Sequence, residues 1–402
     1  MVEKFSKNMN LDKLKAKRVK VMEYSALSEL LRVTAKPEII SLAGGLPAPE
    51  SFPLKVIKEL NDLILKKHGS LSLQYGPTNG ARILREEIVK WLKERHMKVT
   101  ADNVGITSGS QGGLDTLGKI FIDEGDMIAV ESPTYIGAVD AFAPYGPSYA
   151  QIKTDDDGVI PESLEKILKT KKIKFVYLVP TFQNPTGKTI PKERRKKIAQ
   201  LIKKFDVLLI EDDPYNSLRY RGIPLDPIQT MAPDNTVYLC TFSKVLAPGL
   251  RIGFYAAPPK IASLMVAAKQ SVDLHTSSYG QYLAAEYLQT GHLKKHLPNI
   301  LNIYRSRLEA MFRALEKYFP KSFRFTRPEG GMFVWITGPK DFDALKIYWK
   351  TIKNNVAFVP GTYFFVKKGD GKNTMRLNFT NINEKQIDQA VKILSEVIKK
   401  NI

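Results

Sequence analysis

The sequence has little of what marks several classes of protein. It contains a single cysteine, Cys240, in 402 residues, so it excludes an internal disulfide framework and fits a reducing compartment. No apolar run reaches the length that crosses a membrane, and the polar, basic N-terminus lacks the apolar core of a signal peptide. Internal repeats and low-complexity segments are also missing. We therefore expect a cytoplasmic protein with no membrane partner.

Acidic residues are also in short supply. There are 41 Asp and Glu against 61 Lys and Arg, which gives a net charge of +20. Such a charge can indicate nucleic acid, an anionic membrane surface or acidic ligands as partners. The basic residues, however, are dispersed in short clusters such as Arg194–Lys197, beside apolar residues of expected helices and strands. Solvated faces of these elements are therefore the preferred interpretation, and we expect no nucleic-acid partner.

The order of apolar patterns predicts an α/β fold. Short apolar runs alternate with helical patterns through the middle of the chain, and the runs are Val104–Thr107, Met127–Val130, Phe175–Val179, Val207–Ile210 and Val237–Cys240. This alternation predicts a large domain with a mostly parallel sheet flanked by helices. Beyond about residue 260 long helices follow, one over about 293–318, then short strands and a terminal helix with an N-cap box at Asn383 and Gln386.

These patterns also suggest domain boundaries. Residues 1–45 are expected to form an N-terminal arm and a helix over Glu23–Val33, which joins the small domain and a dimer interface. Residues 46–292 are expected to form the large domain, and residues 293–402 the small C-terminal domain. The smaller α+β domain would thus be built from both chain ends.

One stretch, Thr241–Gly253, concentrates residues that can carry chemistry. Lys244 has the hydroxyls of Thr241 and Ser243 before it and Arg251 seven residues after it. A Pro-Gly pair between them predicts a turn, so Lys244 and Arg251 can face one pocket. A desolvated lysine can lose its proton and attack a carbonyl, and an arginine with hydroxyls suits a phosphate. By itself, the stretch leaves open an exposed lysine with an unrelated arginine.

Four further loops follow expected strands, at the edge where open α/β sheets bind ligands. They are Thr107–Gly113, Glu131–Tyr135, Pro180–Gly187 and Glu211–Tyr215. The first combines glycines and hydroxyls at a helix N-terminus, which suits an anion, and Tyr135 in the second could stack on a planar cofactor. Taken singly, the first loop is explained equally well as a structural turn before a helix, and Tyr135 as a loop residue packed on the domain surface.

The other two loops are equally open when taken alone. Asn184 precedes a proline, which drives it out of helical geometry and could turn its amide inward, although an ordinary Asn-Pro turn is an equal alternative. Glu211–Asp213 places three carboxylates after a strand, where they repel one another unless a cation or solvent compensates. A metal site, a capping aspartate and a carboxylate opposite a protonated ring nitrogen are the alternatives, and no His or Cys lies nearby in sequence.

Together, these loops and the lysine stretch resemble the site of the fold-type I pyridoxal-phosphate enzymes. The chain is most similar to the class I/II aminotransferase branch that contains 2-aminoadipate, kynurenine and aromatic aminotransferases. The resemblance runs from about Ser25 to the C-terminus, with motifs in the family's order: Leu42–Pro49, Gln74–Pro77, Thr107–Gln111, Asn184–Gly187, Asp212–Tyr215, Ser243–Lys244, Arg251 and Met375–Leu377. It implies a transaminase that uses pyridoxal 5′-phosphate and moves an α-amino group from an amino acid to a 2-oxo acid such as 2-oxoglutarate.

The resemblance implies roles around the cofactor. Lys244 would form the Schiff base and then act as general base and acid, and Asp212 would pair with the pyridinium nitrogen. Tyr215 and Asn184 would bind the ring oxygen, and Tyr135 would stack on the ring. The residues that would hold the phosphate are Ser110, Gln111, Thr241, Ser243 and Arg251.

The resemblance also implies how substrate and a second subunit are bound. Arg376 would take the substrate α-carboxylate beside Asn184, and Gly44 and Gly45 would let the backbone pass close to the substrate. Tyr75 would reach the cofactor phosphate of a neighbouring subunit, which implies a homodimer with shared sites. The Asn184–Pro185 bond is a candidate cis peptide.

One departure bears on the substrate. The branch can use an arginine of the N-terminal helix for a distal carboxylate, and the corresponding residue here is Ser28, with Arg32 one turn further. This weakens a strict preference for acidic side chains and leaves aromatic or broad specificity open.

Two other functions remain as alternatives. The first is another reaction on the same scaffold, such as a β-lyase or a decarboxylase. The second is a DNA-binding regulator with an aminotransferase-like domain, but only about two dozen residues precede the first family-like helix, too few for a separate folded domain.

Overall fold

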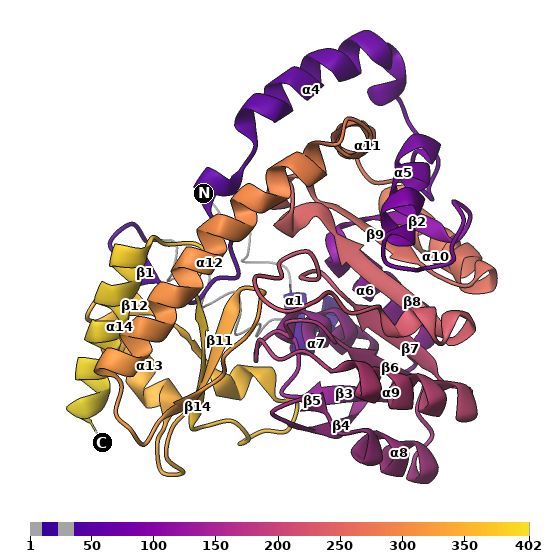
Figure 1. Ribbon diagram of the computed structural model, residues 1–402. Helices are drawn as coiled ribbons and strands as arrows, with labels where there is room; N and C mark the ends of the chain where they lie inside the picture. Colours follow the sequence, from indigo (N-terminus) through magenta and orange to yellow (C-terminus); the bar gives the residue numbers. More distant parts are fainter. Residues whose placement is uncertain (1–9, 23–35, 402) are drawn as a thin grey trace.

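A computed structural model describes residues 10–22 and 36–401 (Figure 1). The chain forms an eight-stranded sheet, a four-stranded sheet and a two-stranded sheet. The expected helix over Glu23–Val33, with Ser28 and Arg32, lies outside the described residues. Short helices α1 (Leu11–Leu14) and α2 (Val19–Met22) precede that segment.

The large sheet has the strand order β2-β9-β8-β7-β6-β3-β4-β5. Its strands are β2 (Val104–Ser108), β3 (Met127–Ser132), β4 (Ser148–Asp155), β5 (Gly158–Val159), β6 (Phe175–Leu178), β7 (Leu208–Asp212), β8 (Thr236–Thr241) and β9 (Ile252–Ala256). The run from β8 to β4 is parallel, whereas β9 is antiparallel to β8 and β2 and β5 is antiparallel to β4. The prediction of a mostly parallel sheet is thus confirmed, and β4, β5 and β9 were not anticipated.

Helices cover both faces of this sheet, as the side chains of β6 illustrate. Tyr177 packs in one cluster with residues of α6 and α7, whereas Val176 and Leu178 pack in another with residues of α8 and α9. The alternation follows from the pleat, because successive strand residues point to opposite faces. The helices of this part are α4 (Leu54–Lys67), α5 (Arg82–Lys93), α6 (Gly109–Phe121), α7 (Ile136–Phe142), α8 (Pro161–Thr170), α9 (Lys192–Lys204), α10 (Pro259–Asp273) and α11 (Ser278–Gln289).

The remaining elements form a smaller α+β unit. Its antiparallel sheet consists of β10 (Arg324–Phe325), β11 (Phe333–Thr337), β14 (Thr374–Asn378) and β13 (Val359–Pro360). The long helix α12 (His292–Tyr318) runs beside the terminal helix α14 (Glu384–Lys399), and α13 (Ala344–Ile352) lies near them (Figure 1). The expected long helix and the N-cap box of Asn383 and Gln386 are both confirmed.

Both chain ends contribute to this unit, as expected. Strand β1 (Ile40–Ser41) pairs in parallel with β12 (Val356–Ala357). The segment that follows β1 therefore begins at the small unit and runs toward the large sheet, which positions Gly44 and Gly45 between them.

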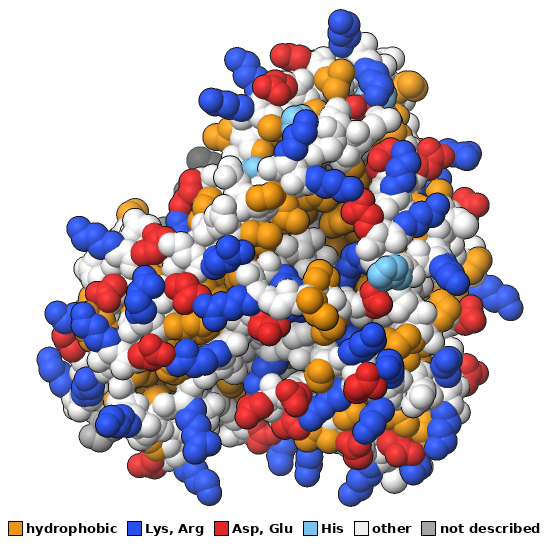
Figure 2. All heavy atoms as spheres, in the orientation of Figure 1, with side chains coloured by type: hydrophobic (Ala, Val, Ile, Leu, Met, Phe, Trp, Pro, Cys, Tyr) orange, Lys and Arg blue, Asp and Glu red, His pale blue; other side chains and the backbone are white. Residues whose placement is uncertain are grey.

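Basic side chains are spread over the face shown in Figure 2, with acidic side chains among them rather than one continuous basic patch. Several pair locally, as Arg194 does with Asp155. Within the described part of the chain, none of the helices combines the length and apolarity that a membrane span requires.

Candidate active site

A cavity of about 120 Å³ lies at the C-terminal edge of the large sheet, where β2, β3, β6, β7 and β8 end. It is lined by Ser110, Gln111, Tyr135, Val179, Asn184, Asp212, Pro214, Tyr215, Thr241, Ser243, Lys244 and Arg251. Loops that lie far apart in the sequence meet here because parallel strands end at the same edge. Every residue that the sequence predicted around a cofactor lines this cavity, except Tyr75.

Lys244 enters the cavity from a short helical turn after β8. Thr241 shapes this turn, because its Oγ1 accepts a hydrogen bond from the Ser243 N–H at 3.2 Å and lies 2.9 Å from Ser243 Oγ. The Lys244 Nζ donates to the Gly45 carbonyl oxygen at 3.0 Å. Burial lowers the pKa of Lys244 to about 8, and the charge of Arg251 acts in the same direction. The amine is therefore largely neutral at mildly basic pH and can act as a nucleophile.

The three consecutive carboxylates at the end of β7 have different partners, although the charge of Asp213 still raises the pKa of Asp212 and of Glu211. Glu211 accepts two backbone N–H groups of the following loop, both at 2.8 Å. Asp213 pairs with Arg95 at 2.8 Å, and only Asp212 lines the cavity. No group of three or more potential metal ligands occurs among the described residues.

The two carboxylate oxygens of Asp212 differ in their hydrogen-bond partners. Its Oδ2 accepts a hydrogen bond from the Tyr177 hydroxyl at 2.8 Å, whereas its buried Oδ1 has no partner among the described residues. Burial raises the pKa of Asp212 to about 7, and the hydrogen bond from Tyr177 opposes this rise. A buried acceptor without a donor is costly, so Oδ1 is suited to a protonated ligand atom.

The opposite end of the cavity is built for an anion. Helix α6 begins with Gly109 at φ +71°, and a Cβ there would lie 2.3 Å from Arg251 Nη2. Arg251 can approach the helix N-terminus this closely because that position lacks a side chain. The Gln111 side chain donates to the Gly137 carbonyl at 2.7 Å, so its amide group is already engaged. The free N–H groups of the first turn, together with Arg251, form a phosphate-sized cradle.

Arg376 reaches the site from β14 of the small unit. Its Nη1 donates to Asn184 Oδ1 at 2.7 Å and its Nη2 to the Ala43 carbonyl at 2.5 Å, whereas its Nε has no partner within the described residues. The guanidinium carbon lies 4.2 Å from the ring centroid of Phe333 and 4.9 Å from that of Phe364. Burial lowers its pKa to about 10, which still leaves it charged at neutral pH.

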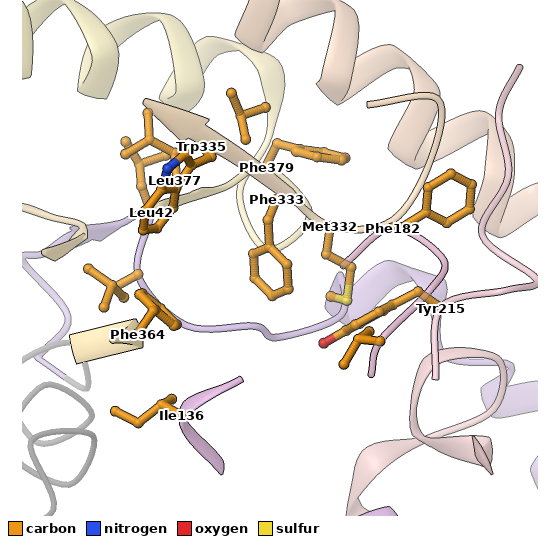
Figure 3. Packing of buried hydrophobic residues seen from close by; sticks show 14 of the residues in the cluster. Leu42, Ile136, Phe182, Tyr215, Met332, Phe333, Trp335, Phe364, Leu377 and Phe379 are labelled. Atoms are coloured by element: carbon orange, nitrogen blue, oxygen red, sulfur yellow. The ribbon is translucent and has the colours of Figure 1, made fainter. Parts of the chain in front are cut away.

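Asn184 connects this arginine to the cavity, since its amide nitrogen donates to the Tyr215 hydroxyl at 3.4 Å. The ring of Tyr215 in turn packs edge-on against Phe333, with centroids 5.8 Å apart (Figure 3). A Cβ on Gly45 would lie 3.0 Å from the Phe333 ring, whereas one on Gly44 would meet, among the described residues, only the Leu46 side chain. The peptide bond before Pro185 is cis, as expected, and so is the one before Pro133.

Tyr75 does not join the cavity of its own chain. It is 78% exposed and contacts the ring of His275 edge-on, with centroids 5.7 Å apart. Tyr177 is the opposite case, because sequence reasoning treated it only as part of a buried strand. The signal that could have found it is a phenol in an otherwise aliphatic and aromatic run, on the strand next to Asp212.

The geometry fits pyridoxal 5′-phosphate at each of its functional groups. The aldehyde needs a neutral amine, which Lys244 provides, and the ring nitrogen needs a buried carboxylate, which Asp212 provides. The ring face needs an aromatic neighbour, Tyr135, and the phosphate needs an anion site, which the start of α6 provides. Together with the α/β fold, this set of groups defines a pyridoxal-phosphate-dependent enzyme.

Comparison with known proteins identifies the family. The chain belongs to the family "Aminotransferase class I and II", whose model matches residues 37–394. It is 45% identical over 388 residues to aromatic-amino-acid aminotransferase 1 of Thermococcus litoralis, covering 95% of this chain and 93% of that one. It is 39% identical over 382 residues to the 2-aminoadipate transaminase of Thermus thermophilus, covering 94% of each.

A solved structure agrees with these relatives. The kynurenine aminotransferase of Pyrococcus horikoshii superimposes with a TM-score of 0.94 at 44% identity, and the match covers 98% of each chain. The protein is therefore a transaminase that uses pyridoxal 5′-phosphate and acts on amino acids and 2-oxo acids, which confirms the function predicted from the motifs.

Proposed function

We propose that Lys244 holds the cofactor and moves the proton during transamination. The observation that carries this proposal is the convergence of Lys244, Asp212 and Arg251, from separate loops, on one cavity. Bound pyridoxal phosphate supplies a ring that accepts the electron pair left at the substrate α-carbon. The Nζ of Lys244 takes the proton from that carbon, and its lowered pKa favours the neutral amine that this step needs.

The other residues bind and orient. Asp212 Oδ1 would accept a hydrogen bond from the protonated ring nitrogen, Tyr215 and Asn184 would donate to the ring oxygen, and Tyr135 would stack on the ring. The first turn of α6, the hydroxyls of the β8 turn (Thr241 and Ser243) and Arg251 would hold the phosphate. Thr241 Oγ1 also contacts the Ile252 carbonyl at 3.1 Å, which ties this turn to β9.

Arg376 recognises the group that all amino-acid substrates share. Its contacts to Asn184 and Ala43 fix the guanidinium, and its Nε, which has no partner among the residues that the structure describes, leaves a donor for the substrate α-carboxylate. Because Arg376 lies in the 293–402 unit and Lys244 in the 46–292 unit, the substrate binds between the two domains that we propose for the chain. The rings of Phe333 and Phe364 enclose this carboxylate site with apolar surface.

For the amino donor, we propose broad use of apolar and aromatic side chains, with 2-oxoglutarate among the acceptors. The relatives named for aromatic amino acids, kynurenine and 2-aminoadipate support this range. The Ser28 position weakens a strict requirement for a distal carboxylate.

The working unit is a homodimer with shared sites. Leu54, at the start of α4, is 71% exposed, and Leu71 and Leu73, in and just after the turn that follows α4 and close to Tyr75 in the chain, are 67% and 69% exposed. Such an apolar surface is costly in a monomer and suits a second copy of the chain. Tyr75 would then leave its own subunit and approach the exposed Arg251 side of the partner's cavity. The single cysteine of the chain is consistent with a cytoplasmic location.

A donor panel tests this proposal. The holoenzyme is assayed with phenylalanine, tyrosine, kynurenine, 2-aminoadipate, glutamate and alanine, with 2-oxoglutarate as acceptor, and kcat/KM is compared. We expect amino transfer with aromatic donors at rates that equal or exceed that for 2-aminoadipate. A preference of more than about 100-fold for the acidic donors, the effect of one additional ion pair, would reject the proposed specificity. Ammonia, pyruvate or carbon dioxide released without amino transfer would favour the lyase or decarboxylase alternative.

A further inference from the structure

Tyr177 lies behind the cavity rather than in it. It is fully buried on β6, and its hydroxyl donates to Asp212 Oδ2 at 2.8 Å. In the parallel pair of β6 and β7, Tyr177 is aligned with Ile210, and Asp212 follows two residues later on the same face. The long phenol spans this offset, so the contact follows directly from the strand register.

The two oxygens of Asp212 therefore have different roles. Oδ2 is occupied by Tyr177, whereas Oδ1 of this cavity-lining residue is buried and has no partner in the part of the chain that the structure describes. A hydrogen bond to one oxygen fixes the plane of a carboxylate, so the free oxygen has a defined direction. The phenol thus aims Asp212 at whatever lies on the cavity side.

We propose that Tyr177 is a positioning residue that keeps Asp212 ionised and directed at the ring nitrogen of the cofactor. This inference rests on the proposed role of Asp212. An O–H donor stabilises the carboxylate form, so the proton shared by Asp212 and the ring nitrogen resides on the nitrogen. The ring then accepts electrons better, which raises the rate of the step at the α-carbon without contact between Tyr177 and substrate.

The surrounding groups make such support necessary. Burial raises the pKa of Asp212 to about 7, the neighbouring Asp213 acts in the same direction, and the Tyr177 hydroxyl opposes both. The pKa of Tyr177 is itself raised well above 10.0, so the phenol keeps its proton and remains a donor at working pH. The other titratable groups that interact with Asp212 are Glu131, Tyr135 and Tyr215. Of these interacting groups within the described residues, Tyr177 is the one that donates a hydrogen bond to Asp212.

The direct test measures the ring nitrogen itself. The Tyr177→Phe holoenzyme is loaded with cofactor that carries ¹⁵N in the ring, and its ¹⁵N chemical shift is compared with that of the wild type. We expect a move toward the unprotonated form, a rise in the pH midpoint of the cofactor's visible band, and a fall in kcat of about 10- to 100-fold. The KM should stay within about threefold, because Tyr177 does not touch substrate.

A matched control removes a hydroxyl from the same sheet. Tyr255 on β9 is 2% exposed, and among the described residues its hydroxyl donates to the Ala262 carbonyl alone, at 3.4 Å. Tyr255→Phe should retain the wild-type ¹⁵N shift and kcat. If Tyr177→Phe binds the cofactor with a wild-type ¹⁵N shift and kcat, the proposal is overturned.

A double-mutant cycle covers the case in which Tyr177→Phe fails to fold. In an Asp212→Asn background, the carboxylate that accepts the Tyr177 hydrogen bond is replaced by a neutral amide. The double variant with Tyr177→Phe should therefore fold, and its kcat should be no lower than that of Asp212→Asn. An additional loss of tenfold or more would show that Tyr177 acts independently and would overturn the proposal. The Asp212→Asn variant alone distinguishes failure of the proposed role of Asp212 from failure of the proposed role of Tyr177. Wild-type activity of Asp212→Asn would reject the role of Asp212. Low activity of Asp212→Asn together with wild-type activity of Tyr177→Phe would reject only the role of Tyr177.

Discussion

Arg376 donates from Nη1 to Asn184 Oδ1 at 2.7 Å, which joins the last strand of the small sheet to the loop after β6 of the large sheet. Asn184 in turn donates to Tyr215 at 3.4 Å. The arginine proposed to bind the substrate carboxylate is therefore connected directly to the residues proposed to bind the cofactor ring. These hydrogen bonds form one chain across the boundary between the two sheets.

This connection predicts the effect of Arg376→Lys. A lysine cannot keep the contacts to Asn184 and Ala43 and also bind a carboxylate in a bidentate manner. We expect the KM of every amino donor and every 2-oxo acid to rise by about 100-fold, whatever the side chain, because the α-carboxylate is common to all. Steady-state kinetics measures this. Arg327→Lys is the control, since Arg327 stacks on Phe312 and Phe325 away from the cavity, and its KM values should stay at the wild-type level.

Replacing Lys244 tests the residue at the centre of the proposal. Lys244→Ala should lose the visible absorbance of covalently bound cofactor and reduce turnover by about 1,000-fold or more, since both the nucleophile and the proton carrier are gone. Absorbance spectra and single-turnover assays measure the two effects. Lys188→Ala is a suitable control, because that lysine pairs with Asp156 outside the cavity. A normal spectrum for Lys244→Ala would contradict the assignment.

The capture of cofactor by the apoprotein should depend on pH through Lys244. Burial lowers the pKa of this amine from 10.5 to about 8. Below pH 8 the protonated amine predominates and cannot attack, so the second-order rate should rise about tenfold per pH unit up to pH 7 and level off above pH 8. Stopped-flow absorbance measures it. A rate that continues to rise to pH 10 would mean that Lys244 has the pKa of an exposed lysine.

Gly109 offers a test of the phosphate cradle alone. Gly109→Ala adds a Cβ 2.3 Å from Arg251 Nη2 at a φ of +71°, so Arg251 or the helix start must move. We expect the affinity for pyridoxal phosphate to fall about 10- to 100-fold, whereas the weak affinity for pyridoxal, which lacks the phosphate, changes little. Gly125→Ala is matched in backbone, with φ +88° and no atom within 4 Å of the added Cβ. It should lose stability but keep cofactor affinity, as fluorescence titration would show.

Particular residues show how far the sequence alone could lead. The Pro-Gly turn placed Lys244 and Arg251 in one cavity, and the motif order identified the family, because both depend on local chemistry. Tyr177 and the separate partners of Glu211 and Asp213 depend on strand register and on loops distant in sequence, which no local pattern contains. Strand β9 was not predicted because Ile252–Ala256 follows directly on the turn that contains Lys244 and Arg251, and the start of the strand was taken as part of that turn.

Hybrid dimers test whether Tyr75 contributes to the cofactor site of the neighbouring subunit. Each proposed site combines its own Lys244 with the partner's Tyr75. Homodimers of Lys244→Ala should therefore be inactive. Homodimers of Tyr75→Ala should bind cofactor about tenfold less tightly, as expected for one lost hydrogen bond to a charged group. A hybrid of one Lys244→Ala subunit and one Tyr75→Ala subunit contains one site with both native residues. Purified hybrids should therefore show about half of the wild-type activity per dimer at limiting cofactor. If Tyr75 acted within its own subunit, no site in the hybrid would be complete, and activity would not exceed half of that of the Tyr75→Ala homodimer.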